Sequence, residues 1–274
     1  MLAIATDYAH DTGCPEPALR RIAEAGFSRV HWCHHWSDDF LYSDVEVDAI
    51  SRWLADYHLS LDGVHATTGA EKRWTSSLEY ERLAGVELVK NRISLAQRLG
   101  GDVIVIHPTS EEGDKFPPAF AALTKSLDEL EPFARRSNVR LALENGDFAQ
   151  IQTLFSRYSS DFLGLCFDSG HANLAPFERT GLDHLEKLKD RLLILHLHDN
   201  NGLWDQHIIP FSGTIDWDRL ARILAGSPCA DRLTLETLMQ EAGIDDEAAF
   251  LAKAHEVGVK LSDMVQRHRP KPSP

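Results

Sequence analysis

The sequence predicts an α/β protein in which eight parallel strands and eight helices alternate and close into a (β/α)8 TIM barrel. Eight short apolar runs alternate with helix-forming segments at intervals of about 25 to 40 residues, the repeat of successive βα units. The 274 residues of the chain also suit one such barrel, which commonly takes about 250 residues. Acidic and histidine residues end many of the runs, and a parallel barrel brings all its strand ends to one face.

The expected strands are apolar nearly throughout. Residues 102–107 read DVIVIH and residues 163–168 read LGLCFD, as strands buried on both faces of a parallel sheet should. We expect strands at residues 2–6, 28–34, 59–65, 102–107, 139–144, 163–168, 192–198 and 233–236.

The segments between these runs carry apolar residues with a helical period. Val47 and Ile50 belong to such a pattern in residues 44–57. The expected long helix 78–99 is followed by Gly100, a residue that favours the end of a helix. We expect helices at residues 15–25, 44–57, 78–99, 117–136, 148–158, 178–188, 217–224 and 246–265.

Composition indicates one domain and restricts the partners. No break in composition separates a second domain, so we expect a single TIM-barrel domain over residues 1–266. Residues 267–274, RHRPKPSP, are basic and Pro-rich and are expected to form a flexible C-terminal tail. The net charge of −14 gives no general attraction to nucleic acid or anionic membrane, so neither is an expected partner.

Cysteine usage and the first residues indicate the compartment. The four cysteines form no C-x-x-C pair and suggest no disulfide framework, which fits a reducing cytoplasm. The first residues lack a basic region and reach Asp7 too early for a signal peptide. No apolar run approaches the length of a membrane span. The sequence therefore predicts a cytoplasmic protein without a membrane partner.

The acidic and histidine residues at the strand ends predict a metal centre. An ionised carboxylate in a barrel mouth is costly unless it is paired or metal-bound. Few basic residues adjoin Glu144, Asp168 and Glu236, so metal binding is favoured over ion pairs. Nine residues are candidates for this centre: His65, His107, Glu144, Asp168, His171, His196, Asp205, His207 and Glu236.

Some of the histidines leave alternatives open. His196 and His198 are two apart on one expected strand, so both can point inward. We favour His196 as the metal ligand and leave His198 a structural role or a contact behind the ligands. His171 follows Asp168 by three residues, and it suits a metal ligand, a substrate hydrogen-bond donor or a helix-end residue.

The remaining candidates suit additional ligands or substrate binding. His65 and His107 end the third and fourth expected strands, where either binds a second metal or positions substrate. Asp205 and His207 lie in the loop after the seventh strand, and loops at this face commonly carry function. Mixed oxygen and nitrogen ligands with several histidines favour zinc or manganese, with magnesium and cobalt as further candidates.

Five motifs resemble those of the xylose isomerase-like barrel superfamily, which holds sugar isomerases and epimerases and also endonuclease IV. The resemblance covers nearly the whole chain. Its strongest marks are LALEN at 141–145, FDSGHAN at 167–173, HLHDN at 196–200, DQH at 205–207 and LTLET at 233–237.

The resemblance implies a ligand set. Tagatose- and psicose-type epimerases of this superfamily hold one divalent metal with Glu, Asp, His and Glu. These positions match Glu144, Asp168, His196 and Glu236 by motif, and the residue matching His171 binds substrate. All nine candidates also have counterparts among the ligands of the three zinc ions of endonuclease IV.

The chain departs from both groups of relatives. The segment after His65 has no aromatic residue before Trp74, whereas the nuclease places a DNA-inserting tyrosine there. The Gly-Glu-Gly that follows the D-x-H motif of the nuclease is also missing. Residues 200–209 contain no arginine, the residue with which the epimerases hold substrate oxygens. The first two departures make nucleic acid an unexpected partner. No obvious Arg/Lys cluster near the strand ends marks a phosphate site, which favours an unphosphorylated substrate.

We therefore expect a metal-dependent sugar isomerase or epimerase that acts on a small ketose or related polyol. Glu144 and Glu236 would move a proton next to the carbonyl through an enediolate. The alternatives are an inosose-type polyol dehydratase and an endonuclease IV-like zinc phosphodiesterase. The resemblance also allows a homo-oligomer, since such relatives are often dimers or tetramers. The residues expected to bind substrate are His171, His65, His107, Trp36 and Trp204, with Trp74 as a further apolar wall.

Overall fold

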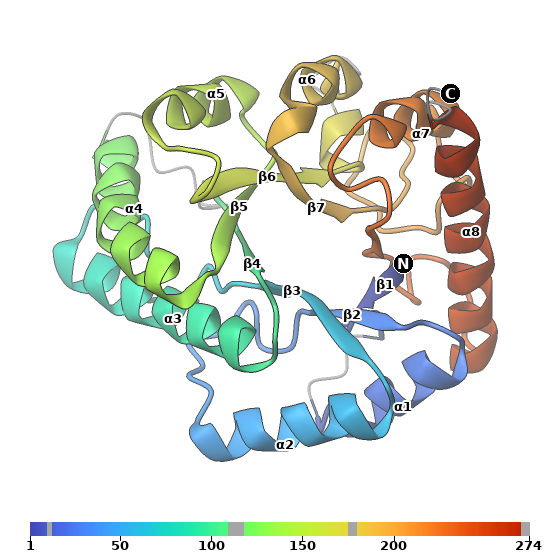
Figure 1. Ribbon diagram of the computed structural model, residues 1–274, viewed down its shortest axis with the longest axis horizontal. Helices are drawn as coiled ribbons and strands as arrows, with labels where there is room; N and C mark the ends of the chain where they lie inside the picture. Colours follow the sequence, from blue (N-terminus) through green and yellow to red (C-terminus); the bar gives the residue numbers. More distant parts are fainter. Residues whose placement is uncertain (10–12, 109–117, 175–179, 270–274) are drawn as a thin grey trace, which may run out of the picture.

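A computed structural model confirms the (β/α)8 barrel and describes residues 1–9, 13–108, 118–174 and 180–269. Eight parallel strands form the barrel in the order β7-β6-β5-β4-β3-β2-β1-β8. The helices surround the strands on the outside, and the strands face a common interior (Figure 1). This arrangement places the carboxyl ends of all the strands at one mouth.

The strands lie where the apolar runs predict them, and most are shorter by one or two residues. Most strand residues are fully buried, in keeping with their near-continuous apolar sequence. Their bounds are β1 Leu2–Ala5, β2 Arg29–Trp32, β3 Ser60–His65, β4 Val103–Ile106, β5 Arg140–Glu144, β6 Leu163–Asp168, β7 Leu192–His196 and β8 Leu233–Leu235.

The helices also follow the expected order. Two short 3₁₀ helices accompany them, η1 over His171–Asn173 and η2 over Lys189–Arg191. The α-helices are α1 Glu16–Glu24, α2 Asp44–Asp56, α3 Glu79–Arg98, α4 Pro118–Ser137, α5 Phe148–Arg157, α6 Gly181–Leu188, α7 Trp217–Ala225 and α8 Glu247–His268.

Local sequence explains where several helices begin. Ser43 and Glu46 form a capping box at the start of α2, so that orphan backbone N–H groups find acceptors. Asp147, Asp216 and Asp246 cap α5, α7 and α8 through their carboxylates. Each cap of this kind stabilises a helix by about 1 kcal/mol and fixes the direction in which the chain enters it.

The barrel closes between its first and last strands. β1 pairs with β2 on one side and with β8 on the other. β7 reaches β8 through a single parallel bridge between Leu197 and Leu235, one residue beyond the end of β7. On β6 and β7, Asp168 and His196 are paired in register, so their side chains start from neighbouring positions at the mouth.

A buried ion network occupies the opposite, amino-terminal end of the barrel. Asp62 on β3 is fully buried, and its Oδ1 accepts hydrogen bonds from Arg29 Nε at 2.8 Å and Arg232 Nε at 2.9 Å. Thr234 donates its hydroxyl to the other carboxylate oxygen of Asp62 at 2.6 Å. Two cations and a hydroxyl thus satisfy a carboxylate that water cannot reach.

The largest differences from the expected bounds lie at two helix ends. α6 begins at Gly181, and residues 178 and 179 of the expected helix lie outside the described residues. α8 runs to His268 and so includes the first two residues of the expected tail 267–274. His268 and Arg269 pair with Asp218 and Asp231, which anchors this end, whereas residues 270–274 lie outside the described part. None of the described helices combines the length and apolar character needed to cross a bilayer.

Candidate metal centre at the mouth of the barrel

Four strands deliver the four expected metal ligands to one point. Glu144, Asp168 and His196 are the last residues of β5, β6 and β7, and Glu236 follows β8 directly. Ligand atoms of these four side chains all lie within 4.8 Å of one another. All four residues are buried, with at most 8% of any one exposed. Three carboxylates and an imidazole so close together, without a lysine or arginine among them, form a favourable donor set for a divalent cation.

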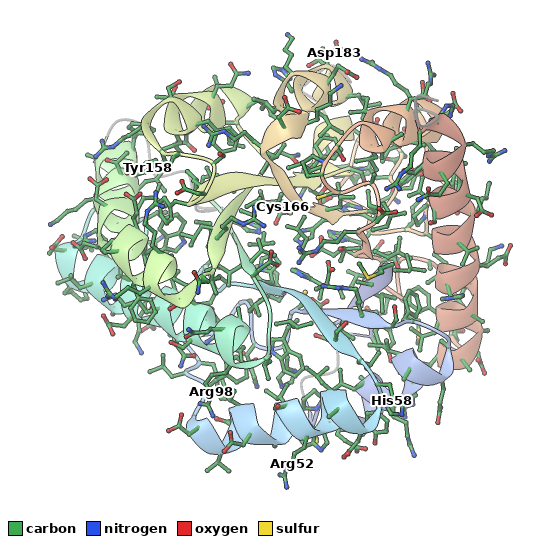
Figure 2. All side chains as sticks on the ribbon, viewed as in Figure 1. Arg52, His58, Arg98, Tyr158, Cys166 and Asp183 are labelled. Atoms are coloured by element: carbon green, nitrogen blue, oxygen red, sulfur yellow. The ribbon has the colours of Figure 1, made fainter. Side chains whose placement is uncertain are left out.

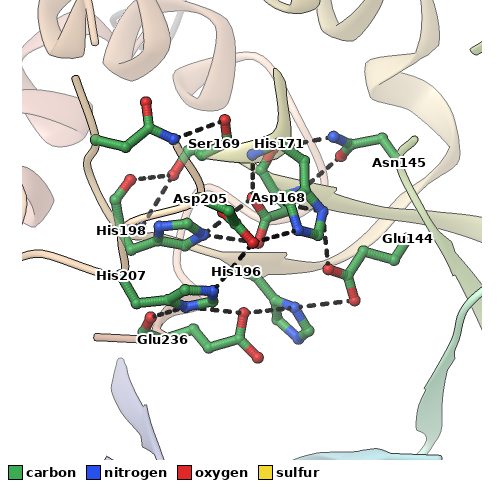
Figure 3. A network of polar contacts seen from close by, with 12 residues as sticks. Glu144, Asn145, Asp168, Ser169, His171, His196, His198, Asp205, His207 and Glu236 are labelled. Carbon is green, nitrogen blue, oxygen red and sulfur yellow. Dashed lines mark hydrogen bonds and ion pairs between the residues drawn. The ribbon is translucent and has the colours of Figure 1, made fainter. Parts of the chain in front are cut away.

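The positions of His196 Nδ1 and Glu144 Oε2 also suit a bound cation. His196 Nδ1 lies 3.2 Å from Glu144 Oε2 and 3.0 Å from Glu236 Oε2, and Figure 3 shows the carboxylates approaching it from opposite sides. Neither contact has hydrogen-bond geometry, and both Nδ1 of His196 and Oε2 of Glu144 lack a hydrogen-bond partner. Buried polar atoms normally have partners, so these two fit the role of metal ligands.

His65 and His107 extend the cluster toward β3 and β4. His107 Nε2 lies 3.1 Å from Glu144 Oε2, and His65 Nε2 lies 3.6 Å from the same oxygen. The two Nε2 atoms are 3.2 Å apart. These histidines and Glu144 therefore form a second group of atoms close enough to share a cation.

The loop after β7 brings Asp205 and His207 to the other side of the mouth. Asp205 Oδ2 lies 3.1 Å from His171 Nε2 and 3.5 Å from His207 Nε2. His171 in turn places Nδ1 3.2 Å from Glu144 Oε1. The structure thus brings all nine candidate residues into one continuous cluster, while their individual roles remain predictions.

Two residues hold Asp168 from behind. His198 places Nε2 3.1 and 3.0 Å from the two carboxylate oxygens of Asp168. Asn145 binds the backbone of Asp168 through both ends of its side-chain amide, at 2.7 and 3.0 Å. Both roles expected of His198, a structural one and support of the metal ligands, are compatible with this placement and remain predictions. Asn145 belongs to the LALEN motif of residues 141–145, but its contact with Asp168 depends on how β5 and β6 pair.

The histidines keep the buried carboxylates ionised. Burial alone raises the pKa of Glu144, but the neighbouring His107 and His196 outweigh it and hold that pKa well below its usual value. Burial likewise raises the pKa of Asp168, but His171 and His198 lower it to about 2. At neutral pH both carboxylates are therefore available as charged ligands.

The carboxylates have the opposite effect on the histidines. Burial lowers the pKa of His171, but Asp168, Asp205 and Glu144 raise it well above its usual value. Burial also lowers the pKa of His207, and its contact with Asp205 is the main cause that raises it to about 10. Without a cation, the site thus balances its negative charge with protons on imidazoles, which a metal would displace.

Sequence reasoning missed two residues that line the floor of the site. His31, in β2, is fully buried and places Nε2 3.1 Å from Nε2 of His196. Cys166 precedes Asp168 by two residues on β6 and lies in the barrel interior, as Figure 2 shows. Burial raises the pKa of its thiol to about 12, so it is neutral. Cys166 and Asp168 are two residues apart on one strand, a spacing that predicts side chains on the same face. Nothing in the local sequence predicts the contact between His31 and His196.

The expected aromatic walls occupy different environments. The ring of Trp36 lies 4.6 Å from that of His65 and 5.9 Å from that of His107, measured between centroids, so it borders the cluster. Trp204 is 70% exposed on the loop that carries Asp205. Trp74 is buried in the hydrophobic core. Contact of Trp36 or Trp204 with substrate remains a prediction.

Comparison with known proteins identifies the family. Residues 19–254 match the xylose isomerase-like TIM barrel family. The chain belongs to this family. The resemblance inferred from the five motifs is thereby confirmed.

Relatives within the family differ in how much of the chain they match. The protein y4fM of Sinorhizobium fredii is 33% identical over 282 aligned residues, covering 92% of this chain and 90% of that protein. A probable endonuclease 4 of Pediococcus pentosaceus is 27% identical over 44% of this chain and 46% of its own length.

Solved structures of the same fold include sugar epimerases. An L-ribulose 3-epimerase superposes with a TM-score of 0.79 at 17% identity, covering 100% of this chain and 99% of that chain. A D-tagatose 3-epimerase-like protein gives a TM-score of 0.76 at 20% identity, covering 97% of this chain and 98% of that chain. At these identities the likeness establishes the shared barrel architecture.

Proposed function

We propose that this protein is a metal-dependent isomerase or epimerase of a small ketose or related polyol. The observation that carries the proposal is the buried convergence of Glu144, Asp168, His196 and Glu236 within 4.8 Å at the barrel mouth. The structural neighbours named as an L-ribulose 3-epimerase and a D-tagatose 3-epimerase-like protein suggest the substrate class.

The proposed reaction moves a proton on the carbon next to a carbonyl. Glu144 and Glu236 reach the site from β5 and from the end of β8, three strands apart around the closed barrel. A sugar carbon between them would present one face to each carboxylate. One carboxylate accepts the proton and the other returns it to the opposite face, which inverts that carbon.

The other residues prepare the site for this step. A divalent cation, when bound, would act as a Lewis acid that stabilises the negative charge developing on the carbonyl oxygen. Asp168 and His196 would hold that cation together with the two glutamates. His171, which is 25% exposed, lies nearer the solvent side and would donate a hydrogen bond to a substrate hydroxyl. Trp36 would exclude water beside His65 and His107.

Isotope exchange tests this proposal directly. Metal-free protein is prepared with a chelator, loaded with Mn²⁺, Zn²⁺, Co²⁺ or Mg²⁺, and incubated with ketopentoses and ketohexoses in heavy water. We expect deuterium to enter at the carbon next to the carbonyl, with a new epimer or isomer in the NMR spectrum, and no exchange without metal. Absence of exchange with every loaded metal would contradict the proposal. A product that is lighter than the substrate by one water, seen by mass spectrometry, would instead assign the dehydratase alternative.

A second candidate function is zinc-dependent phosphodiester hydrolysis. The observation that favours it is the additional group formed by His65, His107 and Glu144, which offers room for more than one cation. The relatives named as probable endonuclease 4, which cover between 43% and 72% of the chain, support the same function. Metal analysis giving three zinc ions per chain, with cleavage of a duplex that contains an abasic site, would establish this function. An intact duplex at high protein concentration would exclude it.

A further inference from the structure

His31 is a buried histidine whose position suggests a task in the metal centre. It lies in the middle of β2, is 0% exposed, and places its ring 4.8 Å from that of His196, centroid to centroid. The two Nε2 atoms face each other at 3.1 Å. The residues that make this contact are 165 positions apart in the chain, so it exists only in the closed barrel.

The contact restricts where the two rings carry their protons. A hydrogen bond between two imidazole nitrogens needs one N–H donor and one lone-pair acceptor. The other nitrogen of His196, Nδ1, lies among the carboxylates of Glu144 and Glu236. If Nδ1 binds a cation through its lone pair, a neutral His196 must carry its proton on Nε2. That proton then points at His31, whose Nε2 must accept it.

We infer that His31 is a positioning residue that selects the Nε2–H tautomer of His196 and thereby aims the Nδ1 lone pair at the metal site. This inference rests on the metal-dependent function proposed above. A metal-binding histidine generally has its second nitrogen fixed by a hydrogen bond, and loss of that partner weakens metal binding. In most such sites the partner is a carboxylate, carbonyl or water, and here it is the imidazole of His31.

The surroundings of His31 restrict the position of its ring. The carbonyl oxygen of His31 accepts a hydrogen bond from the backbone N–H of Thr6 at 2.9 Å, which ties β2 to β1 at this residue. Gly63 on β3 leaves the space that the ring needs. A Cβ atom at position 63 would come within 3.2 Å of His31 Nδ1 and within 2.6 Å of Ile194 Cδ1. The ring is therefore held between β1, β3 and β7 with little freedom to turn away.

A matched pair of substitutions tests the inference. H31Q and H31M have unbranched side chains of similar length, but only glutamine offers a strong acceptor near the position of Nε2. I194V, a small change at a fully buried residue that like His31 lies next to Gly63, controls for altered packing. Affinity for Mn²⁺ and Zn²⁺ is measured by competition with a chromophoric chelator, with no sugar present.

We expect H31M to bind both ions about 10- to 100-fold more weakly, and H31Q and I194V to stay close to wild type. Equal affinity of H31M and wild type would overturn this inference and leave the proposed function standing. A wild-type protein that binds no divalent ion would overturn both.

A second measurement does not depend on how well the variants fold. Long-range ¹H–¹⁵N spectra of zinc-loaded wild type should show His196 protonated at Nε2 and metal-bound at Nδ1. A spectrum with His196 metal-bound at Nε2 would overturn the inference. H31M, where it folds, should lose the Nε2–H signal that the hydrogen bond protects from solvent exchange.

Discussion

The ring of His198 is held between the carboxylate of Asp168 and the backbone carbonyl of Gln206. Its Nε2 lies 3.0 Å from Asp168 Oδ2, and its Nδ1 lies 3.1 Å from the Gln206 oxygen. Gly170 makes this placement possible, because a Cβ atom there would lie only 2.0 Å from Cε1 of His198. The orientation of Asp168, an expected metal ligand, thus depends on having glycine at position 170.

The substitution G170A should therefore weaken metal binding. The added methyl group would push His198 away from Asp168, and loss of such a supporting contact typically weakens metal affinity about 10- to 100-fold. Overpacking should also lower the free energy of unfolding by about 1 to 3 kcal/mol. Chelator competition and urea unfolding measure the two effects.

G146A is the matched control for G170A. It lies two residues beyond Glu144, and a Cβ atom there would meet nothing within 4 Å. Its metal affinity should equal that of wild type. If G170A also binds metal normally, the support that His198 gives to Asp168 is not needed for binding.

Replacing Glu236 by glutamine should stop proton transfer while keeping the shape of the side chain. An amide cannot accept the proton, so we expect the rate of deuterium exchange at saturating metal to fall by about 10²- to 10⁴-fold. The exposed Glu241, in the loop that follows, provides the control E241Q, which should exchange at the wild-type rate. Exchange by E236Q at an undiminished rate would remove Glu236 from the reaction and leave Glu144 as the only carboxylate in that role.

The low pKa of Asp168 predicts how the stability of the metal-free protein depends on pH. Its pKa of about 2 in the folded protein lies below the ordinary value of 3.8. The ionised carboxylate therefore stabilises the fold at every pH above about 4. The contribution, about 2 kcal/mol, should disappear as the pH falls from about 4 to 2. D168N should thus be less stable than wild type at pH 7, and the gap should narrow in acid. Urea unfolding with chelator present measures this, and a gap independent of pH would contradict it.

Metal removal should lower the melting temperature of the protein. A ligand that binds only the folded state at 100 times its Kd adds about 2.7 kcal/mol to the free energy of unfolding. We expect thermal scans to show a higher melting temperature with Mn²⁺ or Zn²⁺ and a smaller rise with Mg²⁺, since histidine ligands suit magnesium less well. The double variant E144Q/D168N should show no gain. A gain in that variant equal to the wild-type gain would place the cation elsewhere.

The ion network at the amino-terminal end should affect stability without affecting the site. D62N leaves Arg29 and Arg232 without their shared carboxylate in a buried position. Breaking such a network typically costs about 3 to 5 kcal/mol in the free energy of unfolding. Metal affinity of the folded protein should not change, because Asp62 lies at the far end of the barrel. A large loss of affinity in D62N would show that the two ends are coupled.

Most of the fold was predictable because its signals are local. The near-continuous apolar character of β4 and β6 and the capping residues of α2 each act within a few neighbouring positions. Helix ends were less predictable. α8 passes the expected end because His268 and Arg269 reach Asp218 and Asp231, residues that are distant in sequence.

The chemical groups at the strand ends could be read from the sequence, because each apolar run is followed by an acid or a histidine. Which of these groups meet depends on the tertiary structure. His31 faces His196, and His107 faces Glu144, because closing the barrel sets the order and register of the strands. The alternation of residues along a strand determines the face on which a side chain lies. Which atom of another strand that side chain contacts depends on how all eight strands pack together.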